Sequence, residues 1–110
     1  MRDKKTETTK TETKPIVSIA MGSDSDIPIM QEAGKILADF NVAYELFLTS
    51  AHRSPQRTET YAKGLKKRGV KIVIVGAGMA AHLAGVIAAN CELPVIGVPL
   101  DASSLNGMDA

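Results

Sequence analysis

Two side chains suited to proton transfer and to anion binding stand next to each other in residues 50–55, Ser-Ala-His-Arg-Ser-Pro. The imidazole of His52 titrates near neutral pH and can move protons, whereas the guanidinium of Arg53 suits an anion such as a phosphate. Ser54 is a good helix N-cap and Pro55 is favoured in a first helical turn, so helix N-terminal N–H groups would add to the anion site. The stretch indicates a proton-transferring site for an anionic small molecule; the alternative is an ordinary surface loop.

A second polar stretch, residues 22–26, reads Gly-Ser-Asp-Ser-Asp and has the polarity needed for phosphate and hydroxyl recognition. Its glycine lets backbone approach a ligand, Ser23 and Ser25 can donate hydrogen bonds, and Asp26 could accept one from a ribose hydroxyl. It is neither a Walker A loop nor a G-x-G-x-x-G turn. Without a ligand, the same residues would form a helix N-cap with extra turn residues.

A third stretch, residues 76–82, reads Gly-Ala-Gly-Met-Ala-Ala-His, and its small residues permit a ligand ring to lie against the backbone. It lacks the third glycine and the acidic residue of a dinucleotide fingerprint, so no NAD site is expected. His82 has an alternative role as a helix-start histidine. The two histidines and one cysteine of the chain make no recognised metal-ligand spacing, and no metal is expected.

Strands and helices that alternate along the chain would position these loops. Short apolar runs predict four parallel strands, at residues 16–21, 42–48, 70–75 and 94–98. Helical spacing predicts three helices, one after residue 26, one over 55–68 that Gly69 ends, and one over 83–90. The first helix has a predicted core face made of Ile29, Ala33, Ile36 and Phe40, widened by Met30 and Leu37.

This order of elements predicts an α/β fold: a three-layer open parallel sheet of the flavodoxin-like or Rossmann-like kind. In such sheets ligands bind beyond the carboxyl ends of the strands. All the polar loops, residues 103–106 included, fall on that edge. Together they support a binding site more strongly than any one of the loops does alone.

Length and composition predict one domain over residues 15–110, preceded by a disordered tail of Lys, Thr and Glu at 1–14. The formal net charge of +1 gives no general drive toward nucleic acid or a membrane. The tail has no apolar core and is not a secretory signal. The lone Cys91 excludes an internal disulfide framework and fits a reducing compartment, so a cytoplasmic protein is expected.

Taken together, the three stretches and Val-Ile-Gly-Val-Pro at 95–99 resemble the PurE family of purine biosynthesis, the N5-carboxyaminoimidazole ribonucleotide mutases. The resemblance covers residue 16 to the last residue. It implies transfer of a carboxylate from N5 to C4 of the ribonucleotide by decarboxylation, re-addition of trapped CO2 at C4 and removal of the C4 proton. It implies no cofactor, a small dry pocket and a homo-octamer with active sites near subunit boundaries.

Residue by residue, the resemblance implies His52 as the catalytic acid and base and Arg53 as the ligand of the 5′-phosphate, with Ser25 assisting. Ser23 and Asp26 match substrate-binding positions. The remaining expected substrate-binding residues are Ser50, Gly78, Ala80, His82 and Leu83, of which His82 would orient the substrate rather than transfer protons. Arg53 directly after the histidine resembles the branch that takes the N-carboxylated substrate; the branch that takes aminoimidazole ribonucleotide and CO2 tends to have lysine there.

Met79 and Ala84 depart from the family, which often has glycine and proline at these positions. Family members also continue well beyond this sequence, so a domain incomplete at its C-terminus is expected. Two other functions stay open. One is a carboxylase of the same superfamily acting on a pyridine dinucleotide, against which the string Ala-Ala-His-Leu at 80–83 counts. The other is a non-catalytic nucleotide-binding domain; a receiver-type domain would need a phosphoacceptor Asp where Gly76 follows the third strand.

Overall fold

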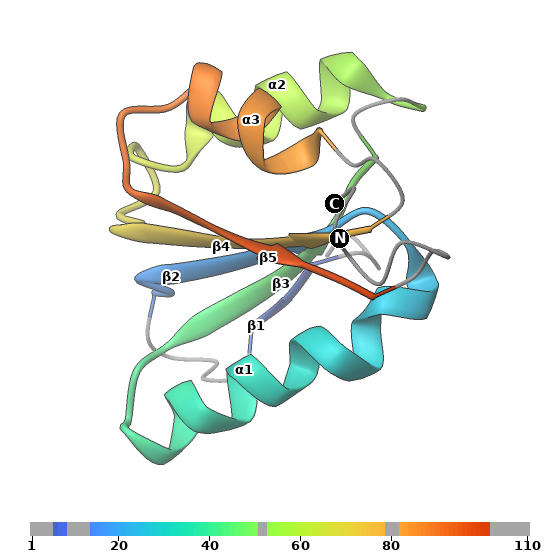
Figure 1. Cartoon of the computed structure of the whole chain (residues 1–110). Coiled ribbons are helices and arrows are strands. Elements are labelled where there is room, and N and C mark those ends of the chain that lie inside the picture. Colours follow the sequence, from blue (N-terminus) through green and yellow to red (C-terminus); the bar gives the residue numbers. More distant parts are fainter. Residues whose placement is uncertain (1–5, 9–13, 51–52, 79–81, 102–110) are drawn as a thin grey trace.

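The computed structural model describes residues 6–8, 14–50, 53–78 and 82–101, and in them one sheet lies between two helical layers (Figure 1). Helix α1 covers one face of the sheet, and helices α2 and α3 cover the other (Figure 1). The strands, in the sheet order β1-β3-β2-β4-β5, are Thr6–Thr8, Tyr44–Leu48, Val17–Met21, Ile72–Ala77 and Val95–Pro99. The helices are the 3-10 turn η1 (Asp24–Asp26), α1 (Ile27–Asp39), α2 (Pro55–Gly64) and α3 (Leu83–Ala89).

The four strands β2 to β5 are parallel to one another, as the alternation of apolar runs and helices predicts. Each of these strands begins within two residues of its predicted start. The three predicted helices are also present. The predicted fold class, an open parallel three-layer α/β sheet, is confirmed.

Strand β1 is an addition that the sequence analysis did not predict. Thr6–Thr8 pairs antiparallel with β3, within the segment expected to be a tail. A β-branched residue favours a strand, and β3 would otherwise leave a row of backbone hydrogen-bonding groups at the sheet edge. Apart from Lys14, the rest of residues 1–14 lies outside the described residues, so its predicted disorder stays a prediction.

The core on the α2 and α3 side is built from alternate strand residues, those that point to this face of the sheet, and from the inner faces of both helices. Val73 and Val75 of β4 pack there against Leu65, Leu83 and Ile87, which are 0–3% exposed. Tyr61 and Ala62 of α2 belong to the same cluster. These apolar residues of α2 therefore form the face that meets the sheet.

The core on the α1 side confirms Met30, Ala33 and Leu37 of the predicted face of that helix but not its other three residues. Met30 is 2% exposed, and Leu37 packs on the same cluster, whereas Ile29, Ile36 and Phe40 are 56%, 58% and 74% exposed. Gly34 explains the rotation, because a Cβ there would overlap the ring of Tyr44 of β3. The helix presents its smallest residue to the sheet, and the larger apolar stripe turns outward.

Gly69 ends the helical segment that begins with α2, as predicted, and the backbone hydrogen bonds around it show how. The regular helix ends at Gly64, but turns continue to Gly69, whose φ is +92°. The N–H of Val70 donates to the carbonyl of Leu65 (3.1 Å) and that of Gly69 to the carbonyl of Lys66 (3.1 Å). This is a Schellman cap, in which glycine adopts the left-handed conformation at low cost.

A buried charged cluster ties β2, β3 and the end of the α2 segment together. Glu45 of β3 is 2% exposed and accepts two hydrogen bonds from Arg68, at 3.0 and 2.9 Å, and one from Ser18 at 2.7 Å. The hydroxyl of Ser18 also bonds that of Tyr61. Burial raises the pKa of Tyr61 well above its usual range, so the phenol stays neutral.

In the described part of the chain, no helix is long and apolar enough to cross a membrane.

Candidate functional site

The carboxyl ends of β2 and β3 and the start of α2 surround a hollow of about 320 Å³. Its volume lies at the lower end of the range for small-molecule sites. Three predicted site residues, Ser23, Ser50 and Arg53, line it together. The described residues that line the hollow are Gly22, Ser23, Asp24, Leu48, Thr49, Ser50, Arg53, Ser54 and Arg57.

The wall contributed by the β3–α2 connection is held by the hydroxyl groups of two threonines and a backbone carbonyl. The Oγ1 atoms of Thr49 and Thr58 are 2.8 Å apart, and the Thr58 hydroxyl donates to the carbonyl of Ser54 at 3.2 Å. Both threonines are buried, at 3% and 0% exposure. The N–H of Thr49 also donates to the carbonyl of Met21 at 2.9 Å, which joins this wall to the end of β2.

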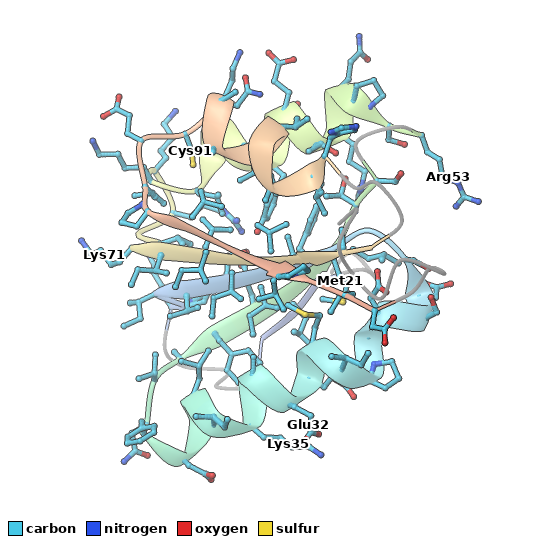
Figure 2. The ribbon with its side chains drawn as sticks, in the orientation of Figure 1. Met21, Glu32, Lys35, Arg53, Lys71 and Cys91 are labelled. Atoms are coloured by element: carbon cyan, nitrogen blue, oxygen red, sulfur yellow. The ribbon has the colours of Figure 1, made fainter. Side chains whose placement is uncertain are left out.

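Ser50 organises the residues just before α2. Its Oγ accepts from the N–H of Arg53 at 3.2 Å, and its carbonyl accepts from the N–H of Ser54 at 2.9 Å. Ser54 occupies the N-cap position as predicted, but its side chain makes no capping hydrogen bond. The exposed side chain of Arg53 extends away from the start of α2, beyond the body of the protein (Figure 2). Arg53 also belongs to the residues that line the hollow.

The β2–α1 connection forms a 3-10 turn rather than a simple loop. Ser23 caps this turn by accepting from the N–H of Ser25 at 3.3 Å, and the two serine Oγ atoms are 2.9 Å apart. Asp26 is only 7% exposed and is not among the residues that line the hollow. Burial raises the pKa of its carboxyl, and a hydrogen bond from the Ser23 backbone partly opposes this effect.

Three predicted site residues next to the β4–α3 connection, Gly78, His82 and Leu83, belong to the described residues. Leu83 is buried, and its Cδ2 lies 3.9 Å from the point that a Cβ on Gly22 would occupy. Gly78 is half-buried after β4, and His82 is exposed just before α3. None of these three lines the hollow.

Gly76 has a packing reason that the sequence analysis did not find. A Cβ on Gly76 would overlap the Sδ of Met30. Gly76, the first residue of the glycine-rich turn, therefore leaves space for the core on the α1 side. This packing role does not depend on a ligand.

Two predicted site residues, His52 and Ala80, lie outside the described residues, as does Met79. Ala84 lies on α3, and its Cβ is 3.5 Å from the point that a Cβ on Gly97 would occupy. Arg57 lines the hollow although no sequence motif indicated it. Helical spacing does not relate it to Arg53, because Arg53 precedes α2 and the N-cap Ser54 has non-helical dihedral angles.

A three-layer parallel sheet with a polar, arginine-lined hollow at the carboxyl ends of its strands defines a ligand-binding α/β protein. The sequence model of the AIR carboxylase family matches residues 16–110, and the chain belongs to this family. Residue-level similarity agrees with this assignment. The N5-carboxyaminoimidazole ribonucleotide mutase of Pyrococcus horikoshii is 55% identical over 97 residues, which are 88% of this chain and 55% of that protein.

Two further relatives differ in length and in name. The phosphoribosylaminoimidazole carboxylase of Saccharomyces cerevisiae is 54% identical over 97 residues, 88% of this chain and 17% of that protein. The crystal structure of Treponema denticola PurE superimposes with a TM-score of 0.79 at 27% identity, covering 86% of this chain and 61% of that one. The chain spans about half the length of the curated mutases it matches.

Proposed function

We propose that this chain carries the substrate-binding edge and the proton-transferring histidine of an N5-carboxyaminoimidazole ribonucleotide mutase, an isomerase of purine biosynthesis. The observation that carries the proposal is the hollow in which Ser23, Ser50 and Arg53 meet at the carboxyl edge of the sheet. Support also comes from the similarity to the mutase of Pyrococcus horikoshii.

The proposed reaction breaks the N5–carboxylate bond, releases CO2 within the site and forms a C–C bond at C4. N5 takes up one proton and C4 loses another, so a single group can give its proton to N5 and then take up the proton from C4. His52 has the chemistry for both steps, because an imidazole near neutral pH exists in both forms. In the sequence it directly precedes Arg53, which lines the hollow.

Binding is assigned to the other residues that the sequence singled out. Arg53, assisted by Ser25, holds the 5′-phosphate, and Ser23 and Asp26 bind the ribose. Ser50 shapes the turn that carries Arg53, through the hydrogen bond described above. Gly78, Ala80, His82 and Leu83 line the part of the site that takes the imidazole and keeps CO2 from water.

Two variants separate proton transfer from binding. We expect His52→Asn to lower turnover by roughly a hundredfold or more while it still binds the ribonucleotide, and Arg53→Ala chiefly to weaken binding. A substrate ¹³C-labelled in its carboxyl shows conversion directly, because the NMR signal moves from the carbamate to the ring carboxylate. The measurement is made on the chain itself and on a chimera in which residues 16–110 replace the matching part of the Pyrococcus horikoshii mutase. Near-normal conversion by His52→Asn in an active chimera would refute the assignment of His52.

A second candidate reaction is carboxylation of aminoimidazole ribonucleotide, because the relative from Saccharomyces cerevisiae is named a carboxylase. The same experiment separates the two reactions. A mutase converts the N-carboxylated substrate without exchange of label into the solution, whereas a carboxylase incorporates label from ¹³C-bicarbonate. The proposal includes neither a metal nor a cofactor, and neither nucleic acid nor a membrane as a partner.

We also propose a cytoplasmic homo-oligomer, an octamer as the family resemblance implies. The outward stripe of α1 supports an oligomer, since Ile29, Ile36 and Phe40 are all more than half exposed. Light scattering on the purified chain gives the mass of the assembly, and Phe40→Glu is expected to reduce it. A monomer at all concentrations would contradict the oligomer for this chain.

A further inference from the structure

Arg57 is the second arginine of the hollow and lies in the first turn of α2, four residues after Arg53, which precedes the helix. Among the described residues that line the hollow, the charged side chains are these two arginines and Asp24, and their charges sum to +1. A phosphate ester carries up to two negative charges, and a pair of guanidinium groups is a common way to bind it.

The guanidinium of Arg57 is held by aromatic stacking. Its Cζ lies 4.6 Å from the ring centroid of Phe47, at the end of β3. That ring in turn stacks on Tyr61, with centroids 4.2 Å apart and planes 5° from parallel. Tyr61 is 6% exposed and bonded to Ser18, so the base of the stack belongs to the core. The stack orients the cation before a ligand arrives.

Arg53 differs from Arg57 in this respect. Arg53 is exposed and extends from the protein (Figure 2), whereas Arg57 is half-buried. An exposed arginine loses rotamer freedom when it binds an anion, and a stacked one loses less. The stacked residue can therefore contribute more to affinity for each hydrogen bond that it makes.

We propose that Arg57 is a positioned cation of the anion site that makes the hollow select a phosphorylated ligand over its unphosphorylated form. This inference rests on the proposed function, because it concerns the same hollow. Arg57 also lines a second hollow of about 460 Å³, together with Phe47, Tyr61 and Arg68. Binding in that second hollow is the main competing outcome.

The test compares ribose 5-phosphate with ribose as probes of the 110-residue chain. Backbone amide shifts in NMR titrations report both the affinity and the place of binding. We expect Arg57→Gln to weaken ribose 5-phosphate about tenfold, equivalent to ~1.4 kcal/mol, and to leave ribose unchanged. Phe47→Leu keeps the charge but removes the stacked ring, and should weaken the phosphate probe about threefold.

Lys63→Gln is the matched control, because it removes the same charge from the same helix at an exposed position, 61% accessible, that does not line the hollow. It should change the affinity less than twofold. An equally large effect of Lys63→Gln, an Arg57→Gln affinity within twofold of wild type, or no binding of ribose 5-phosphate by the wild type would each overturn the inference. Shifts confined to residues 60–64 would overturn it as well, since they would place the anion in the second hollow.

Failure of the proposed function would look different. If ribose 5-phosphate binds through Arg57 but the chimera converts no N-carboxylated ribonucleotide, the anion site stands and the mutase assignment fails. If the chimera is active and Arg57→Gln leaves its KM unchanged, the mutase assignment stands and the role of Arg57 is refuted.

Discussion

Gly76, in the carboxyl-terminal half of β4, is expected to be a glycine that the core requires. A Cβ at this position would overlap the Sδ of Met30 and lie 2.8 Å from its Cε and 3.1 Å from its Cγ. Met30 is 2% exposed, so its side chain cannot swing into solvent. Replacing Gly76 by alanine must therefore displace a buried side chain of α1.

The size of the effect follows from two opposing contributions. Overpacking a core typically costs about 1–3 kcal/mol. Alanine also restricts the unfolded chain more than glycine does, which returns roughly 0.4–1 kcal/mol. Gly76→Ala is thus expected to lower the free energy of unfolding by about 1–2 kcal/mol, or Tm by roughly 5–15 °C for a domain of this size.

Urea unfolding followed by circular dichroism measures this difference, with Gly22→Ala as the control. A Cβ on Gly22 would make only ordinary contacts, 3.8 Å from the carbonyl of Thr49 and 3.9 Å from Leu83. Gly22→Ala should therefore stay within about 0.5 kcal/mol of wild type. In the double variant Gly76→Ala, Met30→Ala, the clash is absent, so its cost should fall about 1 kcal/mol or more below the sum of the single costs. Equal effects of the two glycine variants, or strict additivity in the double variant, would refute the packing argument.

Two further predictions concern buried carboxyl groups. Arg68→Met leaves the buried carboxylate of Glu45 without its guanidinium and should lower the free energy of unfolding by about 2–3 kcal/mol. This is below the roughly 3–5 kcal/mol of a fully buried pair, because the Arg68 side chain is 44% exposed. Lys66→Met, at an exposed ion pair, should cost less than about 0.5 kcal/mol, and equal losses in urea unfolding would contradict the reasoning. For Asp26, burial raises the pKa of the folded state above the ordinary 3.8, so the protonated carboxyl stabilises the fold and this contribution is lost as pH rises through the folded pKa. The unfolding free energy of Asp26→Asn relative to wild type should therefore increase between about pH 3 and pH 7, and a constant difference would exclude this linkage.

Local sequence was sufficient where one residue type decides one conformation. The apolar runs predicted β2 to β5, because a strand covered on both faces needs apolar side chains of both parities. Gly69 predicted the end of the α2 segment, since its φ of +92° is costly for other residues. The resemblance to a family was also a property of sequence alone, because it depends on the order and identity of short motifs.

The face of α1 could not be predicted in this way. Two apolar stripes run along the helix, one through Ile29 and Ile36 and the other through Met30 and Leu37, and helical periodicity fits both. The choice depends on Tyr44, which lies on another element and needs the space beside Gly34. Only the folded chain brings that ring and that glycine together.

The candidate site divides along the same line. The chemistry of Ser23, Ser50 and Arg53 was readable from their types and from their places after strands, since parallel strands deliver their loops to one edge. The role of Arg57 was not, because it depends on a ring of β3 that stacks on its guanidinium. Sequence determined which groups can do chemistry at this edge. Tertiary packing decided which of them are held in place, because the contacts that orient a side chain come from residues distant in the chain.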